Sequence, residues 1–354
     1  MPIVTVLIPA HNAAATLAAT LDSLARQTFR DFDVLLVNDG SGDDTAAIAE
    51  QYRDRLPLQV HHLPQQVGVA GSANYGLARV TSPYIARIDA DDLAVPERLE
   101  KQLAFMEAHP RVDVCGSTIE LFYDDGSRPD HLLAKPAGDA AIKTMLVQCS
   151  ALSNPATMLR KSFFDDVGRY DARLDFAEDY DIWCRGALLG KRYANLPEAL
   201  TRYRQHANQV GRRQRQLQFE RDLAIKRKYL SALLDGAPCG MLAEFFSPLT
   251  AFSSREVAIA ALEHAMPLVM RLAQKVADPA LLGEIVSACV GRHVRQMPAS
   301  LWRISGKGGP APRSAWANNA APLSWNLDLC DARSAAPGVS FAMPAFALAG
   351  SRSA

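Results

Sequence analysis

The amino-acid sequence predicts an α/β protein whose central sheet is mostly parallel and covered by helices on both faces. Short apolar runs rich in β-branched residues alternate with helix-like segments through the first hundred residues. These runs are apolar at successive positions, as expected for strands buried on both faces. Hydrophobic residues make up 49% of the chain and charged residues 21%, which suits a globular protein with a sizeable core. Such an alternation is typical of βαβ units.

The first predicted strand covers residues 4–8. A helix follows, because leucines repeat at i, i+4 and i+7 from Leu17 to Leu24 and so share one helical face. The other elements predicted in this half, in chain order, are a strand at 32–37, a helix and a strand between 44 and 60, a helix at 69–80 and a strand at 84–88.

The rest of the chain is less regular. A predicted strand at 112–116 is followed by a loop rich in Asp, Gly and Pro at 124–138, and long Ala/Leu/Val runs predict helices from 216 to about 297. Beyond Pro298 the composition shifts to Ala, Ser, Gly and Pro without clear periodicity, which predicts weak order. We therefore predict three parts: a domain at 1–210, a helical C-terminal region at 211–300 and a weakly ordered tail at 301–354.

Charge and cysteine usage exclude several classes of protein. Lys plus Arg and Asp plus Glu both total 38, so no net field attracts nucleic acid. The six cysteines are scattered without a C-x-x-C pair, which argues against a zinc site or a disulfide framework and favours a cytoplasmic protein. The first residues predict a buried strand and not a signal peptide, and no apolar run reaches the length of a membrane span. We expect a soluble protein, at most peripheral to the inner face of a membrane.

Polar residues follow three of the predicted strands. In open parallel sheets, ligands bind outside the carboxyl ends of the strands. A purely structural sheet needs only turn-forming residues there, so this edge is the candidate site. The segments that end these strands are Pro9-Ala10-His11-Asn12, Asn38-Asp39-Gly40-Ser41 and Asp89-Ala90-Asp91-Asp92.

The acidic group Asp89, Asp91 and Asp92 allows two interpretations. Three carboxylates at the end of a buried strand repel one another unless a cation is bound, and Mg²⁺ or Mn²⁺ prefers such oxygen ligands. The alternative is an Asp-rich turn in which Asp92 or Asp91 caps the helix that follows Pro96. Similarly, Asp39 could form a plain turn or accept a hydrogen bond from a nucleotide.

Taken together, the motifs resemble inverting glycosyltransferases of family 2, which have the GT-A fold. Six segments match in order and rough spacing over about residues 3–210: Val6–Asn12, Val37–Ser41, Gly68–Gly76, Tyr84–Asp92, Ala177–Trp183 and Tyr203–Val210. Each segment alone is weakly specific, whereas the ordered set is highly specific. The resemblance implies a GT-A nucleotide-diphospho-sugar transferase fold for the predicted domain.

The resemblance also implies roles for individual residues. Asp39 faces the nucleotide base, Asp89 lies near the ribose and Asp91 binds the Mn²⁺ or Mg²⁺ that bridges the diphosphate. Asp179 is the general base that deprotonates the acceptor hydroxyl, as an inverting displacement requires. His206 could join the metal or remain a surface histidine. The nucleotide-sugar contacts expected are Pro9, Ala10, His11, Asn12, Asp39, Gly68, Asn74, Arg87, Asp89, Ala90 and Glu178.

Two local alternatives remain open in this set. Glu178 and Asp179 could simply enrich a helix N-terminus in acid, which the helix dipole favours. Arg202 and Arg204 could neutralise phosphate oxygens or be solvated. The sequence also departs from the family at Gln66, where Asn is usual, and at Ala73, where a basic residue is usual. A Gln-x-x-Arg-Trp motif is not evident, which disfavours processive polymer synthesis.

The predicted function is transfer of a sugar from a nucleotide sugar, with UDP favoured, to a glycan or lipid-linked acceptor in surface polysaccharide biosynthesis. A nucleotidyltransferase would need a Gly-rich basic signature after the first strand, and a dinucleotide oxidoreductase a G-x-G-x-x-G there; neither is present. A non-catalytic binding protein is expected to have lost Asp91 or Asp179, and both are retained. The basic segment 212–228 could lie on an anionic membrane or be a salt-bridged helix, and the helices beyond could form a homodimer contact.

Overall fold

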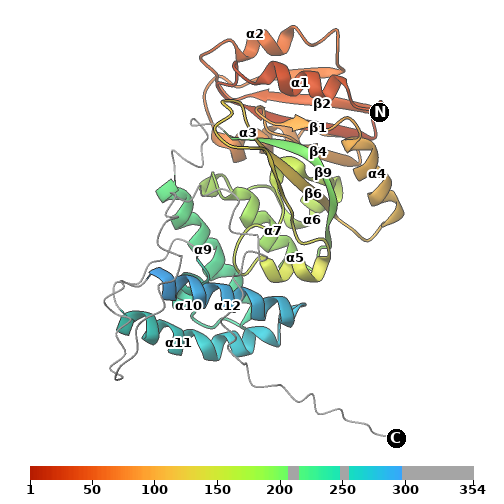
Figure 1. The fold of residues 1–354 in the computed structure, drawn as a ribbon. Coiled ribbons are helices and arrows are strands. Elements are labelled where there is room, and N and C mark those ends of the chain that lie inside the picture. The colour runs from red at the N-terminus through yellow and green to blue at the C-terminus, as the bar shows by residue number, and fades with distance from the viewer. Residues whose placement is uncertain (206–214, 248–254, 297–354) are drawn as a thin grey trace, which may run out of the picture.

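The computed structural model describes residues 1–205, 215–247 and 255–296. Figure 1 shows a central sheet flanked by helices, with the C-terminal helices gathered below it. The strand order in the sheet is β3-β2-β1-β4-β8-β6-β9-β5, and β7 pairs with β6. The predicted α/β class, with helices on both faces and a helical C-terminal region, is confirmed.

The N-terminal half of the sheet is parallel, as predicted. It consists of β1 (Val4–Ala10), β2 (Phe32–Asn38), β3 (Leu58–His62) and β4 (Tyr84–Arg87). Val6 and Ile8 of β1 pack in the same core cluster as the leucines of α1 (Leu17–Ala25), whereas Leu7 packs in the cluster that contains α3 (Gly68–Leu77). Both faces of β1 are therefore buried, which explains its unbroken apolar run. The third helix of this half is α2 (Thr45–Glu50).

The other half of the sheet is mixed. β8 (Met158–Arg160) runs antiparallel to both β4 and β6 (Val114–Tyr123), and β9 (Tyr193–Gln205) runs parallel to β6. The strand predicted at 112–116 is thus much longer than its apolar run suggested. The loop predicted at 124–138 was partly wrong, because β7 (His131–Leu133) pairs with β6 inside it. The short β5 (Leu93–Ala94) pairs antiparallel with β9.

Helices of the middle region surround this mixed half. The helix α7 (Glu178–Leu188) begins at the predicted Glu178–Asp179 motif. The other elements are α4 (Arg98–Ala108), α5 (Asp139–Met145), η1 (Asn154–Ala156), α6 (Lys161–Val167) and η2 (Ala172–Leu174).

The C-terminal helices share a core with the sheet. They are α9 (Arg215–Leu233), α10 (Gly240–Phe246), α11 (Arg255–Ala273) and α12 (Pro279–Gln296). α9 contacts α7, α12 contacts α5, and one hydrophobic cluster runs from Leu7 in β1 to Cys289 in α12. The boundaries predicted near 210 and 300 stay predictions, and the tail predicted at 301–354 lies outside the described residues. Within the described ranges, no helix combines the length and apolar character needed to cross a membrane.

Most of the described basic side chains in the segment 212–228 make contacts within the protein. Lys226 is wholly buried, Arg221 hydrogen-bonds the Asp175 carbonyl, and Arg227 pairs with Glu244 at 2.9 Å. Lys228 is exposed. These contacts fit the salt-bridged-helix interpretation of the segment.

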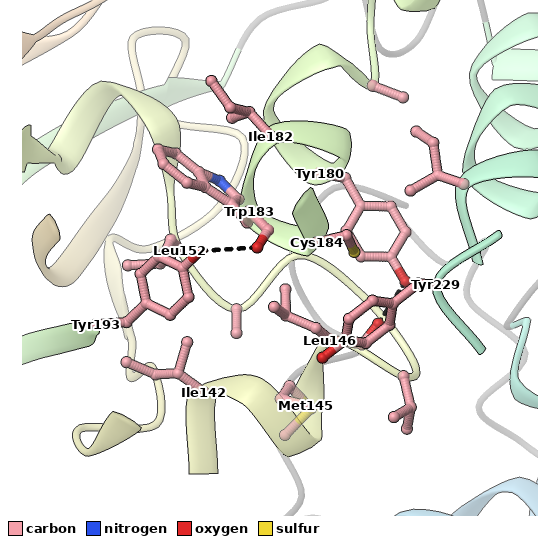
Figure 2. Close-up of a cluster of buried hydrophobic side chains, with 14 of the residues drawn as sticks. Ile142, Met145, Leu146, Leu152, Tyr180, Ile182, Trp183, Cys184, Tyr193 and Tyr229 are labelled. Carbon is pink, nitrogen blue, oxygen red and sulfur yellow. Dashed lines mark hydrogen bonds between the residues drawn. The ribbon is translucent and has the colours of Figure 1, made fainter. Parts of the chain in front are cut away.

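An aromatic cluster joins the sheet to the C-terminal helices (Figure 2). Trp183 of α7 is wholly buried, and its carbonyl accepts a 2.8 Å hydrogen bond from the Tyr193 hydroxyl of β9. The Tyr180 hydroxyl donates to the Leu146 carbonyl at 2.5 Å, and the Tyr229 hydroxyl of α9 donates to the Lys143 carbonyl at 3.2 Å. The first two turns of α7, which include its acidic start, are thereby anchored in the core through Tyr180 and Trp183.

We predict that Trp183→Ala lowers the free energy of unfolding by about 3–5 kcal/mol, because it leaves a cavity in a packed core. Leu189→Ala, just beyond the same helix, is the matched control: Leu189 is 60% exposed, and its truncation should change stability by no more than about 0.5 kcal/mol. Urea unfolding followed by circular dichroism measures both values. Equal losses in the two variants would contradict the prediction.

Candidate active site

The loops after β1 and β2 are joined by hydrogen bonds. His11 Nδ1 lies 2.7 Å from the Asp39 carbonyl oxygen. The Asn12 N–H donates to Ser41 Oγ at 2.9 Å, and the Gly42 N–H donates to Asn12 Oδ1 at 2.9 Å. Asn12 has a φ of 49°, a left-handed conformation that asparagine tolerates better than most residues. The predicted segments 9–12 and 38–41 therefore form one surface at the carboxyl edge of the sheet.

Asp39 connects this surface to α3. Its side chain is buried, and its carboxylate accepts hydrogen bonds from the N–H groups of Val67 at 2.7 Å and Gly68 at 2.9 Å. Gly68 has a φ of 86°, in the left-handed region that favours glycine. In this structure the Asp39 carboxylate thus holds the loop before α3, a role that its turn-like sequence did not reveal.

The three aspartates after β4 come together. One carboxylate oxygen from each of Asp89, Asp91 and Asp92 lies within 4.8 Å of the others. The Asp92 side chain is 1% exposed, and its Oδ2 has no hydrogen-bond partner among the described residues. A buried carboxylate oxygen without a donor is costly unless a proton or a cation compensates it. The arrangement fits the oxygen ligand set that Mg²⁺ or Mn²⁺ prefers.

Asp92 does not cap the following helix, which corrects the role predicted for it. The N-cap position of α4 is Glu97, and no side chain caps this helix. Asp92 Oδ1 instead accepts the N–H of Arg204 in β9 at 2.9 Å. Arg204 also donates from Nε to the Asp91 carbonyl at 2.6 Å and contacts Asp124. Arg202 pairs with Glu120 and Asp130, so neither arginine is simply solvated.

Two buried arginines lie beneath the aspartates. Arg87 is wholly buried, donates to the Leu7 carbonyl at 2.8 Å and lies 3.3 Å from Asp89 Oδ1. Arg98 donates to the Arg87 carbonyl at 2.6 Å, and burial lowers its pKa to about 10. Loss of hydration inside the protein raises the pKa of Asp89 to about 6, even though 37% of its side chain is exposed. The positive charge of Arg87 opposes this shift. Arg87 thus stabilises the ionised form of Asp89 from the buried side of the site.

Glu178 and Asp179 start α7 close to these aspartates. Burial raises the pKa of Asp179 to about 6; the Tyr180 N–H and Lys135 lower it, and Asp89 raises it. The Tyr180 N–H donates to Asp179 Oδ1 at 2.7 Å. Burial, followed by the charge of Asp179, raises the pKa of Glu178 to about 8. Glu178 is buried and its Oε2 has no hydrogen-bond partner among the described residues, so its surroundings favour the protonated form, which can donate a hydrogen bond.

Other predicted contacts have structural partners in this chain. Asn74 exchanges two hydrogen bonds with the backbone of Tyr170, at 2.8 and 3.1 Å. The Ala90 carbonyl accepts from Thr16 and Thr20, both at 3.0 Å, and the Ala10 carbonyl accepts the Asp39 N–H at 2.8 Å. Pro9 pairs with Val37 in the sheet. His206 lies outside the described residues.

Sequence reasoning missed the contributions of Asp175 and Lys135. Asp175 Oδ1 accepts the N–H of Ala70 at 2.9 Å, across 105 residues of chain, and its carboxylate fills the space beside Gly68. Lys135 follows β7 and is close enough to Asp179 to lower its pKa. Asp175 stands two residues before the matched segment Ala177–Trp183, in a stretch that also contains Glu178, Asp179 and Asp181, and this acidity was the available signal. Lys135 stood in a segment with no distinctive pattern.

Comparison with known proteins identifies the family of this chain. The model of "Glycosyl transferase family 2" matches residues 5–168. The chain is 32% identical over 211 residues to the amylovoran biosynthesis glycosyltransferase AmsE of Erwinia amylovora, covering 59% of this chain and 78% of that relative.

Solved structures share the fold at low identity. The S. aureus TarS 1-349 complex with UDP-GlcNAc has a TM-score of 0.56 and 19% identity, covering 84% of this chain and 89% of that one. The mannosyltransferase PcManGT from Pyrobaculum calidifontis, in complex with GDP-Man and Mn²⁺, has a TM-score of 0.51 and 17% identity, covering 83% and 87%. The fold is one shared with sugar transferases. The chain belongs to glycosyl transferase family 2, as the resemblance predicted.

We predict that Gly68→Ala destabilises the protein more than Gly126→Ala does. Both glycines have a positive φ, which costs an alanine about 1–2 kcal/mol. A Cβ at Gly68 would lie 1.8 Å from Asp175 Oδ2, whereas nothing lies within 4 Å of a Cβ at Gly126. Gly68→Ala should therefore cost about 1 kcal/mol more, because Asp175 must give up its bond to Ala70. Urea unfolding of the two variants measures the difference, and equal costs would contradict this contact.

Proposed function

We propose that this glycosyltransferase moves a sugar from a nucleotide diphosphate sugar, with UDP favoured, to an acceptor hydroxyl with inversion. The observation that carries the proposal is the group Asp89, Asp91 and Asp92, whose oxygens lie within 4.8 Å of one another near Asp179. Such a group suits a metal-bridged diphosphate, and Asp179 is the nearby carboxylate that would receive the proton of the acceptor. The UDP-GlcNAc and GDP-Man complexes of the two structural neighbours support a nucleotide-sugar donor.

Asp91 is the ligand we assign to Mn²⁺ or Mg²⁺, with Asp89 beside it on the nucleotide side. A bound divalent cation would offset the negative charge that develops on the departing nucleoside diphosphate. The fit rests on the all-oxygen donor set and on the unpartnered Asp92 Oδ2. The Mn²⁺ in the PcManGT complex supports this assignment. His206 remains a candidate additional ligand.

Asp179 is the general base we assign. The acceptor oxygen forms a bond to the anomeric carbon from the face opposite the diphosphate, the carbon–oxygen bond to the diphosphate breaks, and the acceptor proton passes to Asp179. Inversion requires a single base on the acceptor side, and an ionised carboxylate serves. Glu178 is the neutral neighbour that can donate a hydrogen bond to the donor sugar. His11, Asn12 and the loop at Gly68 would line the nucleotide side.

The acceptor we propose is a glycan or a lipid-linked glycan in surface polysaccharide biosynthesis, at the cytoplasmic side of the membrane. The relative named for amylovoran biosynthesis supports this setting. We also propose a catalytic domain at 1–210 and a helical region at 211–300. The helical region would carry either a peripheral membrane contact or a homodimer contact. The nucleotidyltransferase and binding-protein alternatives lose support from the family assignment and from the retained Asp91 and Asp179.

We predict that binding of a nucleoside diphosphate requires Mn²⁺ or Mg²⁺ and is lost in Asp91→Ala. Removing the assigned ligand leaves the diphosphate charge facing the remaining carboxylates, so affinity should fall at least tenfold. Isothermal calorimetry with UDP, in Mn²⁺ and then in EDTA, measures the effect. Asp130→Ala, whose carboxylate pairs with Arg202 on the protein surface, is the control and should bind normally. Equal binding in the presence of EDTA would exclude the metal assignment.

We predict that Asp179→Asn retains donor binding but lowers kcat by about 10²–10⁴-fold, because only the proton transfer in the transition state is lost. A thermal-shift screen of UDP-, GDP- and dTDP-sugars with Mn²⁺ first selects the donor, and release of nucleoside diphosphate then measures turnover.

The pH profile checks the same assignment. A base acts in its deprotonated form, and the Asp179 pKa is raised to about 6, so kcat should fall as the pH drops below about 6. Asp179→Asn should show no such fall in its residual rate. Wild-type turnover in this variant would place the base elsewhere.

A further inference from the structure

The residue two positions before Glu178 is held in a strained backbone conformation. Phe176 has a φ of 75°, and the other non-glycine residues with positive φ in the described ranges are Asn12 and Asp235. Asn and Asp tolerate the left-handed region because their short polar side chains bond locally, but a bulky aromatic residue is an outlier there. Such strain persists only where the surroundings hold the residue in place, and it concentrates at functional sites.

Helix α9 supplies the contacts that hold this segment. Gln218 Nε2 donates to the Phe176 carbonyl at 3.0 Å. The Arg221 guanidinium donates to the Asp175 carbonyl and lies 5.6 Å from the centre of the Phe176 ring, within cation–π range. Two consecutive carbonyls and the ring between them are therefore held by side chains one turn apart on a single helix.

Helix α9 is itself fixed against α7. Lys226 is wholly buried, pairs with Asp222 at 2.7 Å and lies 5.8 Å from the centre of the Tyr180 ring. The Tyr229 hydroxyl bonds to the Lys143 carbonyl of α5. A buried charge that loses its partner is strongly destabilising, so the pair of Lys226 and Asp222 favours a single position of the helix against α7. Arg221 and Gln218 therefore act from a rigid support.

The held segment also reaches the donor side of the site. The Asp175 carboxylate accepts the Ala70 N–H near the start of α3, beside Gly68. Gly68 is in turn held by Asp39. Residues 175–177 thus connect the loop assigned to the nucleotide with the helix start that carries Asp179.

We propose that Arg221 is a positioning residue of the glycosyl transfer reaction, which fixes Asp175 and Phe176 and thereby the place of the Asp179 carboxylate. The proposal rests on the proposed role of Asp179. Arg221 contacts Asp175 and Phe176 in this structure, and it acts through them. A carboxylate displaced by about 1 Å can lose about 10²-fold in rate while substrate binding persists. Loss of Arg221 should therefore affect kcat far more than the KM for the donor.

The test compares Arg221→Met and Arg221→Lys in the full-length protein. Methionine removes the hydrogen bond and the charge over Phe176, whereas lysine retains a donor and a cation. Release of nucleoside diphosphate from the selected nucleotide sugar should show kcat reduced at least tenfold in Arg221→Met, with KM within twofold of wild type, and a recovery of most of the loss in Arg221→Lys. Arg227→Met, on the same helix, replaces an exposed arginine that pairs with half-buried Glu244, and it should match wild type. A kcat for Arg221→Met within twofold of wild type overturns the proposal.

Hydrogen exchange separates this proposal from the proposed function. Amides of residues 176–180 and of Ala70 should exchange faster in Arg221→Met than in Arg227→Met, while the melting temperatures of both stay close to wild type. Unchanged exchange there overturns the positioning role whether or not the protein turns over a nucleotide sugar. Wild-type protein that releases no nucleoside diphosphate from any nucleotide sugar would refute the proposed function, with the exchange result still deciding whether α9 holds this segment.

A second substitution tests the strain itself. Glycine adopts a positive φ without steric cost, so Phe176→Gly lets the segment keep its conformation with less support. When Phe176→Gly is added to Arg221→Met, kcat of the double variant should be at least threefold higher than that of Arg221→Met alone. A further fall in kcat on adding Phe176→Gly would mean that the aromatic ring, and not the backbone conformation, is what Arg221 supports, and would overturn this account.

Discussion

Five carboxyl groups are crowded at one edge of the sheet, and the rest of the structure must accommodate their mutual repulsion. Asp89, Asp91 and Asp92 follow β4, and Glu178 and Asp179 start α7 nearby. Because the pKa of Asp89, Asp92, Glu178 and Asp179 is raised, their protonated forms are favoured by the fold. These groups cost the folded protein least at low pH, where they are protonated. The free energy of unfolding therefore falls as the pH rises through their raised pKa values. Buried Arg87 and Arg98 offset part of this cost, and a bound cation would offset more.

The topology explains why the crowding occurs at β4. This strand is the last parallel strand of the N-terminal half, and it pairs on its other side with antiparallel β8. The strand order runs outwards from β1 to β3 and then reverses to β4 on the other side of β1, and ligands in open α/β sheets bind at the carboxyl ends of strands at such a reversal. β9 then returns along β6 and brings Arg204 to the backbone of Asp91 and the carboxylate of Asp92. The site is thus closed by a strand that begins about 100 residues after β4.

That distance along the chain separates what the sequence could predict from what it could not. The strands β1, β2 and β4 and the α1 leucines follow from local patterns, and the motifs indicated the aspartates at their ends. The cap predicted for Asp92 failed because a local preference lost to a partner 112 residues away. Strand β7 and the bond from Asp175 to Ala70 were missed for the same reason, since pairing across long separations leaves no periodic signal in either segment.

The part of the chain beyond the family match supplies the acidic start of α7 and the helix that packs against it. The match ends at residue 168, before Asp179, and the helix that holds the segment in front of Asp179 begins at Arg215. A base must be positioned within a fraction of an ångström to act, whereas the shape of an acceptor site can change with its loops. If Asp179 is the base, as proposed, the face of α9 that carries Gln218, Arg221 and Lys226 must keep its contacts with α7 and the segment before it, whereas the outer surface of the C-terminal region is free to diverge.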